Sequence, residues 1–318
     1  MKYSPAILIL LFLHISSVQF AQVRDISRYA SMVSQEKQKG ILSFLADDSL
    51  EGRATNSIGS LMTISMATSL FKQWNMIPFY SQTFVQSFKK DTLIGRNVAG
   101  VVLSSGYSED YIVVSAHYDH LGKIGERIYN GADDNASGVT VLLTLAELFS
   151  NVRTEMPGLK KNILFVLMDE KEHNMAGSKE FVKRLPIPAK NIVCNINIDQ
   201  IGTIFAPPGK DSSYMIVLGT AGNNGFIKKR LDAAKKFYGF DMDINYSYYG
   251  SASFSELFYK TSDQYSFASK KIPSVLVTSG IHMHTYKTTD DYQFINYPVL
   301  AKRTQLLFYL IYHLSEAN

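Results

Sequence analysis

Cysteine is almost absent from the 318-residue sequence, which contains only Cys194. One cysteine cannot form a disulfide within the chain, so a disulfide-stabilised fold is excluded. Cys194 lies in the apolar run 192–198, where a lone cysteine is most often a small core residue. A catalytic thiol is the alternative interpretation, but no separate histidine and asparagine context indicates one.

The sequence also lacks a strong excess of either positive or negative charge. The sequence has 32 Lys and Arg residues against 28 Asp and Glu residues, a net charge of +4, which does not indicate a particular partner. The longest basic cluster, 228–230 followed by Lys235 and Lys236, recurs at helical spacing opposite apolar residues. We therefore expect a solvated helix face there and no nucleic-acid partner. Apolar residues make up 46% of the sequence, which is enough for a buried core and excludes a disordered chain.

The N-terminus lacks an apolar run long enough to span a bilayer comfortably. The run 6–13 is short, Lys2 precedes it, and small residues surround its end near Ala21, which is typical of an export signal. We expect residues 1–21 to be an export signal and the mature protein to be periplasmic or extracellular, without stable membrane insertion. No cysteine follows the run, so a lipoprotein anchor is not expected. An N-terminal membrane anchor is the alternative interpretation.

From residue 96 onward, apolar strand-like runs alternate with helical patterns. The expected strands are 97–103, 111–116, 162–168, 192–198, 214–218 and 274–278, and the expected helices are 136–149, 177–185, 226–237 and 299–314. This alternation predicts an α/β fold, a three-layer α/β/α sandwich around a mixed, mostly parallel sheet. Residues 26–88 lack this alternation and show helical spacing of apolar residues at 41–50 and 61–74. We therefore expect an N-terminal helical segment at 22–88, packed on an α/β domain at 89–318.

Histidine and carboxylate residues stand where predicted strands end or where a helix begins. They are His117, Asp119, Asp133, Asp134, Glu172 and Asp199. Each alone has an ordinary structural interpretation, as a buried hydrogen-bonded histidine, a helix cap or a turn residue. Together they favour a site, because function gathers at the carboxyl ends of parallel strands. One imidazole with several carboxylates suits a divalent metal ion, commonly zinc, which removes the repulsion between the carboxylates.

Several motifs in order resemble the bacterial leucyl aminopeptidase and aminopeptidase S family of co-catalytic zinc exopeptidases. Glutaminyl cyclases and glutamate carboxypeptidase relatives share that scaffold. The motifs lie at 45–53, 116–122, 131–138, 197–202, 262–267 and 271–280. The resemblance implies the zinc-exopeptidase fold and a metallopeptidase of the aminopeptidase type. Such an enzyme hydrolyses N-terminal residues of peptides through a metal-bound water, with one or two zinc ions.

The resemblance also implies roles for individual residues. His117, Asp133 and Asp199 fall at the ligands of one zinc, with Asp133 as the bridge to a second. Glu172 falls at a ligand of that second zinc. Asp119 falls at the carboxylate that orients His117, an arrangement with its own physical logic.

Two positions depart from the family pattern. Lys171 stands where the family has its proton-accepting glutamate, and a protonated lysine has no lone pair with which to accept a proton. Tyr286 stands where the family has a ligand histidine, four residues before Asp290. A neutral phenol is a poor zinc ligand, so the second zinc is in doubt. We expect the nearby His282 and His284 to be surface or capping residues.

We hypothesise that the two departures are linked. The ammonium group of Lys171 would partly replace the charge of a missing second zinc, pairing with Glu172 or Asp133. Two functions then compete: an active exopeptidase with a peptide substrate, and a non-catalytic binding or scaffolding protein with a peptide ligand. A different hydrolase or cyclisation chemistry is a weaker third. The stretch 246–258 is rich in Tyr, Ser and Phe. We expect it either to line a cleft or to form an ordinary packed surface loop.

Overall fold

The computed structural model describes residues 26–90, 92–155, 158–205 and 213–317. The export signal expected at 1–21 lies outside these residues and stays a prediction. Within the described ranges, no helix is both long enough and apolar enough to cross a lipid bilayer.

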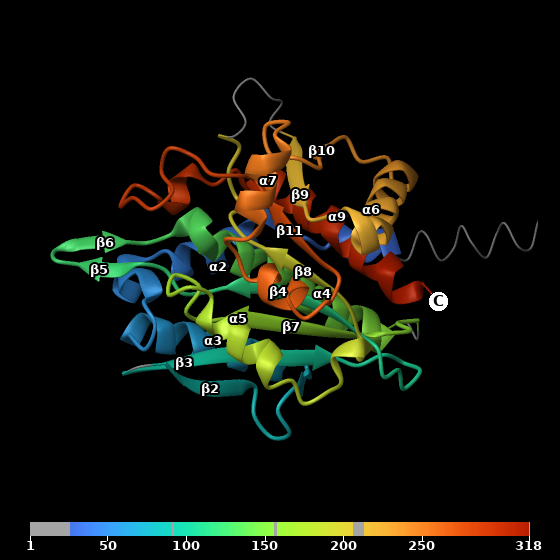
Figure 1. Cartoon of the computed structure of the whole chain (residues 1–318), viewed down its shortest axis with the longest axis horizontal. Coiled ribbons are helices and arrows are strands. Elements are labelled where there is room, and N and C mark those ends of the chain that lie inside the picture. Colours follow the sequence, from blue (N-terminus) through green and yellow to red (C-terminus); the bar gives the residue numbers. More distant parts are fainter. Residues whose placement is uncertain (1–25, 91, 156–157, 206–212, 318) are drawn as a thin grey trace, which may run out of the picture.

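One mixed sheet forms the centre of the fold (Figure 1). Its strands, in spatial order, are β1 (Ile77–Pro78), β3 (Leu93–Val102), β7 (Asn162–Met168), β4 (Tyr111–His117), β8 (Ile192–Ile198), β11 (Ser274–Thr278), β9 (Tyr214–Leu218) and β10 (Asp243–Asn245), with β2 (Val85–Lys90) paired to β3. The central strands β7, β4, β8 and β11 are parallel to one another, whereas β3 and β9 run antiparallel to their central neighbours. A separate hairpin joins β5 (Gly122–Ile124) to β6 (Arg127–Tyr129).

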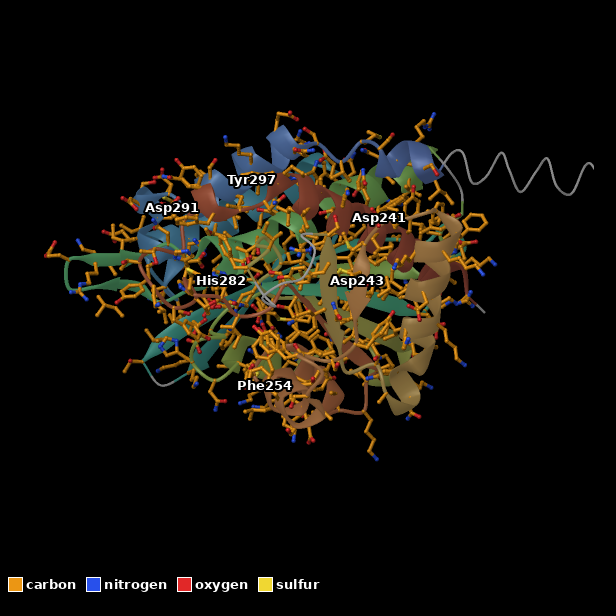
Figure 2. All side chains as sticks on the ribbon, turned by 90° about the horizontal axis from the view of Figure 1, so that it is seen from above. Asp241, Asp243, Phe254, His282, Asp291 and Tyr297 are labelled. Atoms are coloured by element: carbon orange, nitrogen blue, oxygen red, sulfur yellow. The ribbon has the colours of Figure 1, made fainter. Side chains whose placement is uncertain are left out.

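Helices cover both faces of this sheet. One face carries α2 (Gln35–Leu45), α3 (Ile58–Gln73), α4 (Gly138–Glu155), α6 (Gly225–Phe237) and α9 (Tyr297–Glu316), and the other carries α5 (Ala176–Lys183), α7 (Ala252–Tyr259) and α8 (Gln264–Ala268). Figure 2 shows the blue helices α2 and α3 on one side of the sheet and Phe254 of α7 on the other. The shorter helical turns are η1 (Asp48–Arg53), η2 (Ala132–Ser137), η3 (Ala189–Asn191), η4 (Gly222–Asn224) and η5 (Tyr292–Phe294). The predicted three-layer α/β/α architecture is confirmed.

The central strand β7 is apolar from Ile163 to Met168 because both of its faces are covered. All seven residues of β7 are buried. Ile163, Phe165 and Leu167 pack in the core under α4 and α9, whereas Leu164 and Val166 pack in the core under α5 and α8. Successive side chains of a strand point to opposite faces, so two cores require a continuous apolar run without polar alternation.

The N-terminal segment contributes strands as well as the two expected helices. Helix α3 lies where the sequence predicts helical spacing, whereas α2 begins before the range expected at 41–50 and ends at Leu45. Strands β1 and β2 pair with β3 and extend the main sheet. The expected boundary at residue 88 falls inside β2, which ends at Lys90. The alternating burial of β2 is typical of a strand near a sheet edge with one solvated face.

Two smaller expectations are also met. Cys194 is buried in β8, and burial raises the pKa of its thiol to about 12, as expected for an inert core residue. Helix α6 buries Ile227 and Leu231 and leaves Lys229 and Lys236 exposed, so its basic residues form a solvated face.

The core under α4 predicts the effect of a truncation in β7. Phe165 is fully buried and packs against Phe149 with ring centroids 6.3 Å apart. Phe165→Ala should lower the free energy of unfolding by about 3–5 kcal/mol, measured by urea denaturation. The control is Tyr107→Ala, because Tyr107 is 99% exposed and its loss should change the value by less than about 0.5 kcal/mol. Equal effects of the two substitutions would contradict the described core.

Candidate metal centre

Four parallel strands deliver their following loops to one edge of the sheet. In the parallel register, His117 of β4 is opposite Met168 of β7, and Val277 of β11 is opposite Ile198 of β8. The carboxyl ends of these strands are therefore level. The segments that follow them, which include the predicted site residues, begin side by side.

Three buried side chains converge at this edge. Nε2 of His117 lies 3.2 Å from Oδ1 of Asp199 and 3.3 Å from Oδ1 of Asp134. One possible ligand atom from each of the three residues lies within 4.8 Å of the other two. Oδ2 of Asp134 is buried and has no hydrogen-bond partner among the described residues. A buried carboxylate oxygen without a donor fits a group that binds a cation.

Asp119 lies behind His117, where the family resemblance implies it. Nδ1 of His117 is 3.0 Å from the Asp119 carbonyl oxygen and 3.7 Å from its Oδ1. The Asp119 carboxylate accepts backbone N–H groups from Lys171 at 3.1 Å and Glu172 at 3.2 Å, which fixes its position. Burial and the nearby Lys171 disfavour a charged imidazole, but the surrounding carboxylates outweigh them and raise the pKa of His117 well above its usual value. The carboxylates thus favour a positive charge on the imidazole itself.

The structure does not bring Asp133 into this group, which corrects the expectation that it is the bridging ligand. Its oxygens accept hydrogen bonds from Gly202 N at 2.5 Å, the Ser137 hydroxyl at 3.0 Å and the Thr203 hydroxyl at 3.0 Å, and Oδ2 lies 3.0 Å from His282 Nε2. These four partners occupy both oxygens of the carboxylate. The adjacent Asp134 turns toward His117 instead, because Asp134 has a non-helical backbone conformation.

Asp290 and Arg53 fix the loop that carries both aspartates. The two carboxylate oxygens of Asp290 accept the backbone N–H groups of Asp133 at 2.9 Å and Asp134 at 3.0 Å. Arg53 is fully buried and donates to the carbonyl oxygen of Gly131 at 3.0 Å. Gly131 has φ 58°, and a Cβ there would lie 2.3 Å from the Asp134 carbonyl oxygen, so the position requires glycine. Arg53, the last residue of the motif at 45–53, thus helps to fix the loop that carries Asp133 and Asp134.

Lys171 lies within the carboxylate cluster. Its buried Nζ is 3.1 Å from Oε1 of Glu172, 3.4 Å from Oδ1 of Asp134 and 3.9 Å from Oδ2 of Asp199. Burial disfavours the charged form, but these carboxylates hold the pKa of Lys171 well above its usual value. Lys171 therefore stays cationic. Its partners are Glu172, as hypothesised, and Asp134 in place of Asp133.

Tyr286 lies beside the lysine rather than among the carboxylates. Its hydroxyl accepts a hydrogen bond from Nζ of Lys171 at 3.4 Å. Burial raises the pKa of the phenol to about 12, so the hydroxyl is neutral. Its ring stacks on that of His120, with ring centroids 6.2 Å apart.

His120 is a site residue that the sequence pattern did not single out. It is 2% exposed, and neither ring nitrogen has a hydrogen-bond partner among the described residues. Burial lowers its pKa to about 4, so the imidazole is neutral. One possible ligand atom from each of His120, Asp134 and Glu172 lies within 4.8 Å of the others. The signal available in the sequence was its place three residues after His117 at the same strand end.

We expected both histidines after β11 to be surface or capping residues, but His282 does not lie at the surface. The side chain of His282 is 1% exposed and forms the ion pair with Asp133. Figure 2 shows His282 on the half of the molecule from which the β5–β6 hairpin extends. His284 is more open, with Nδ1 2.9 Å from the Thr289 hydroxyl and its ring stacked on Phe294. The buried acid at position 133 accounts for the difference between the two histidines.

The stretch 246–258 packs against the loop that follows β11. Tyr248 is fully buried, and its hydroxyl accepts the backbone N–H of Ile281 at 2.5 Å. The second half of the stretch forms most of α7, whose Phe254 and Phe258 pack around Tyr248. Part of the stretch is therefore core rather than an ordinary surface loop.

Solved structures of bacterial aminopeptidases have the same fold. LapA aminopeptidase of Legionella pneumophila superposes with a TM-score of 0.70 at 17% identity, covering 92% of this chain and 75% of that chain. BSAP, a zinc aminopeptidase from Bacillus subtilis, superposes with a TM-score of 0.69 at 13% identity, covering 88% and 95%. At such identities the similarity shows the fold alone, which is the α/β/α fold of the zinc exopeptidases.

The sequence profile of peptidase family M28 matches residues 97–311, and the chain belongs to that family. The curated relative aminopeptidase YwaD of Bacillus subtilis strain 168 is 28% identical over 148 residues. That match covers 46% of this chain and 30% of YwaD, so the chain spans less than a third of that relative. The match confirms the family-level part of the sequence-based interpretation.

The hydrogen bonds of Asp290 predict a loss of stability. Asp290→Asn should lower the free energy of unfolding by about 1–3 kcal/mol, because an amide nitrogen would face one of the two N–H donors. Denaturation in the presence of a chelator measures the effect without a contribution from metal binding. Asp241→Asn is the control, since Asp241 is exposed and should give no measurable change. Unchanged stability in Asp290→Asn would show that Asp290 does not fix the aspartate loop.

Proposed function

We propose that the chain is an exported zinc-dependent exopeptidase of the aminopeptidase type, close to the leucyl aminopeptidase and aminopeptidase S enzymes of its family. It hydrolyses N-terminal residues of peptides in this proposal. The buried convergence of His117, Asp134 and Asp199 is the observation that supports it. The aminopeptidases among the relatives and structural neighbours support the substrate class.

The donor set fits zinc. One imidazole nitrogen and two carboxylate oxygens, from His117, Asp134 and Asp199, are ligands that zinc takes, and three protein ligands leave a position open. When bound, zinc polarises a peptide carbonyl and lowers the pKa of water. Asp119 supports the set by orienting His117 through Nδ1.

A proton acceptor is also needed, and Lys171 does not supply it because the ammonium group has no lone pair. We assign this role to Glu172. Its side chain is 11% exposed at the edge of the centre and is held 3.1 Å from Nζ of Lys171. The assignment moves the proton-accepting carboxylate one residue along the chain from its position in the family.

The second candidate function is peptide binding without hydrolysis. The observation that favours it is the cation of Lys171 at the position where the family has a carboxylate. A centre without an effective proton acceptor would still hold zinc and bind a peptide end. Turnover of a chromogenic aminoacyl substrate, compared with peptide binding in the same preparation, separates the two functions.

Two substitutions test the proposed enzyme. Asp134→Ala should lose both zinc and hydrolysis, because removing a ligand exceeds the roughly 10–100-fold effect of losing a supporting group. Glu172→Gln should retain zinc and lower kcat by about 10²–10⁴-fold, the usual contribution of proton transfer. Zinc content and initial rates with and without a chelator provide the measurement. Peptide binding without chelator-sensitive hydrolysis in the unmodified protein would instead favour the second candidate.

Export is tested by the N-terminus of the recovered protein. Expression of the full chain in a bacterial host should give a product in the periplasm or medium that lacks about the first 21 residues, as determined by mass spectrometry. Ile9→Asp interrupts the apolar run and should keep the chain inside the cell at full length. Retention of the unmodified chain at full length inside the cell would refute the proposed export signal.

A further inference from the structure

A second group of possible metal ligands consists of His120, Asp134 and Glu172. The ammonium group of Lys171 lies close to both carboxylates of this group. Nζ is 3.1 Å from Oε1 of Glu172 and 3.4 Å from Oδ1 of Asp134. One possible ligand atom from each of Asp134, Glu172 and His120 lies within 4.8 Å of the others. A second divalent ion at this group would have to contact both carboxylates, and the ammonium group already contacts them.

The formal charges of the cluster also indicate one divalent ion rather than two. Asp134, Glu172 and Asp199 contribute three negative charges in the cluster. The ammonium of Lys171 and one divalent ion together supply three positive charges, which neutralise it. A glutamate at position 171, as in the family pattern, would give four negative charges, which two divalent ions neutralise. The change from glutamate to lysine therefore alters the charge by two units, which is the charge of one metal ion.

The loss of an imidazole at position 286 is the other candidate cause of a missing second ion. Tyr286 presents a neutral phenol whose hydroxyl accepts a hydrogen bond from Lys171 and is therefore engaged with the cation. However, His120 still provides a buried imidazole without a hydrogen-bond partner among the described residues, near Asp134 and Glu172. A nitrogen donor thus remains available. The feature that opposes a second ion is the ammonium group.

We propose that Lys171 is a built-in cation that takes the place of a second zinc ion, so that this member of family M28 has a one-zinc centre. The inference rests on the metal centre of the proposed function. It specifies how many ions that centre holds and names the residue that sets the number. Repulsion between the fixed ammonium and a divalent ion a few ångströms away is strong in a buried site.

Zinc stoichiometry measures this directly. The full mature chain is loaded with zinc, dialysed against metal-free buffer and analysed for zinc by mass spectrometry and by titration calorimetry. We expect about one equivalent per chain in the unmodified protein and about two in Lys171→Glu/Tyr286→His. Tyr286→His alone is the matched control and should stay at about one, because the ammonium group remains. Circular dichroism and thermal unfolding establish that each variant is folded.

Four outcomes would overturn the inference. Two tightly bound ions in the unmodified chain would do so without any variant and would leave the proposed zinc enzyme intact. Two ions in Tyr286→His alone would assign the effect to the missing imidazole. One ion in a folded Lys171→Glu/Tyr286→His variant would show that the lysine does not exclude the second ion. No bound zinc in the unmodified chain would overturn the proposed metal centre, and the inference with it.

Discussion

Neutralisation of buried carboxylates is the physical constraint on which the site depends. Asp134, Asp199 and Glu172 lie close together away from water, where their mutual repulsion is costly unless cations are present. The protein supplies one cation of its own through Lys171. The remaining negative charge, arranged around His117, would favour the binding of a divalent ion there.

The fold brings these groups together from distant parts of the chain. Parallel central strands end level, so the loops after β4, β7 and β8 start side by side. Buried polar contacts then fix those loops. The side-chain amide of Asn135 donates through Nδ2 to the Ile198 carbonyl oxygen, and its Oδ1 accepts the backbone N–H groups of Gly138 and Gln200. Rigid support of this kind keeps metal-binding side chains close to their working geometry.

Most of the fold could be predicted from the sequence because its strands are continuous apolar runs and its helices have clear periodicity. The short edge strands β1, β2 and β10 were not predicted, since their pairing depends on β3 and β9 rather than on their own composition. In the site, motif order placed His117, Asp119, Lys171, Glu172, Asp199 and Tyr286 in one region. The choice between Asp133 and Asp134, and the contribution of His120, depend on the local backbone path, which residue types alone do not specify.

The central claim is that His117, Asp134 and Asp199 together hold a divalent ion beside the ammonium of Lys171. A crystal of the zinc-loaded protein, measured on both sides of the zinc absorption edge, locates the metal without reference to activity. We predict one anomalous peak in contact with the three side chains, with Nζ of Lys171 still placed between Asp134 and Glu172. A zinc-loaded crystal whose anomalous peaks all lie away from His117, Asp134 and Asp199 would contradict the claim.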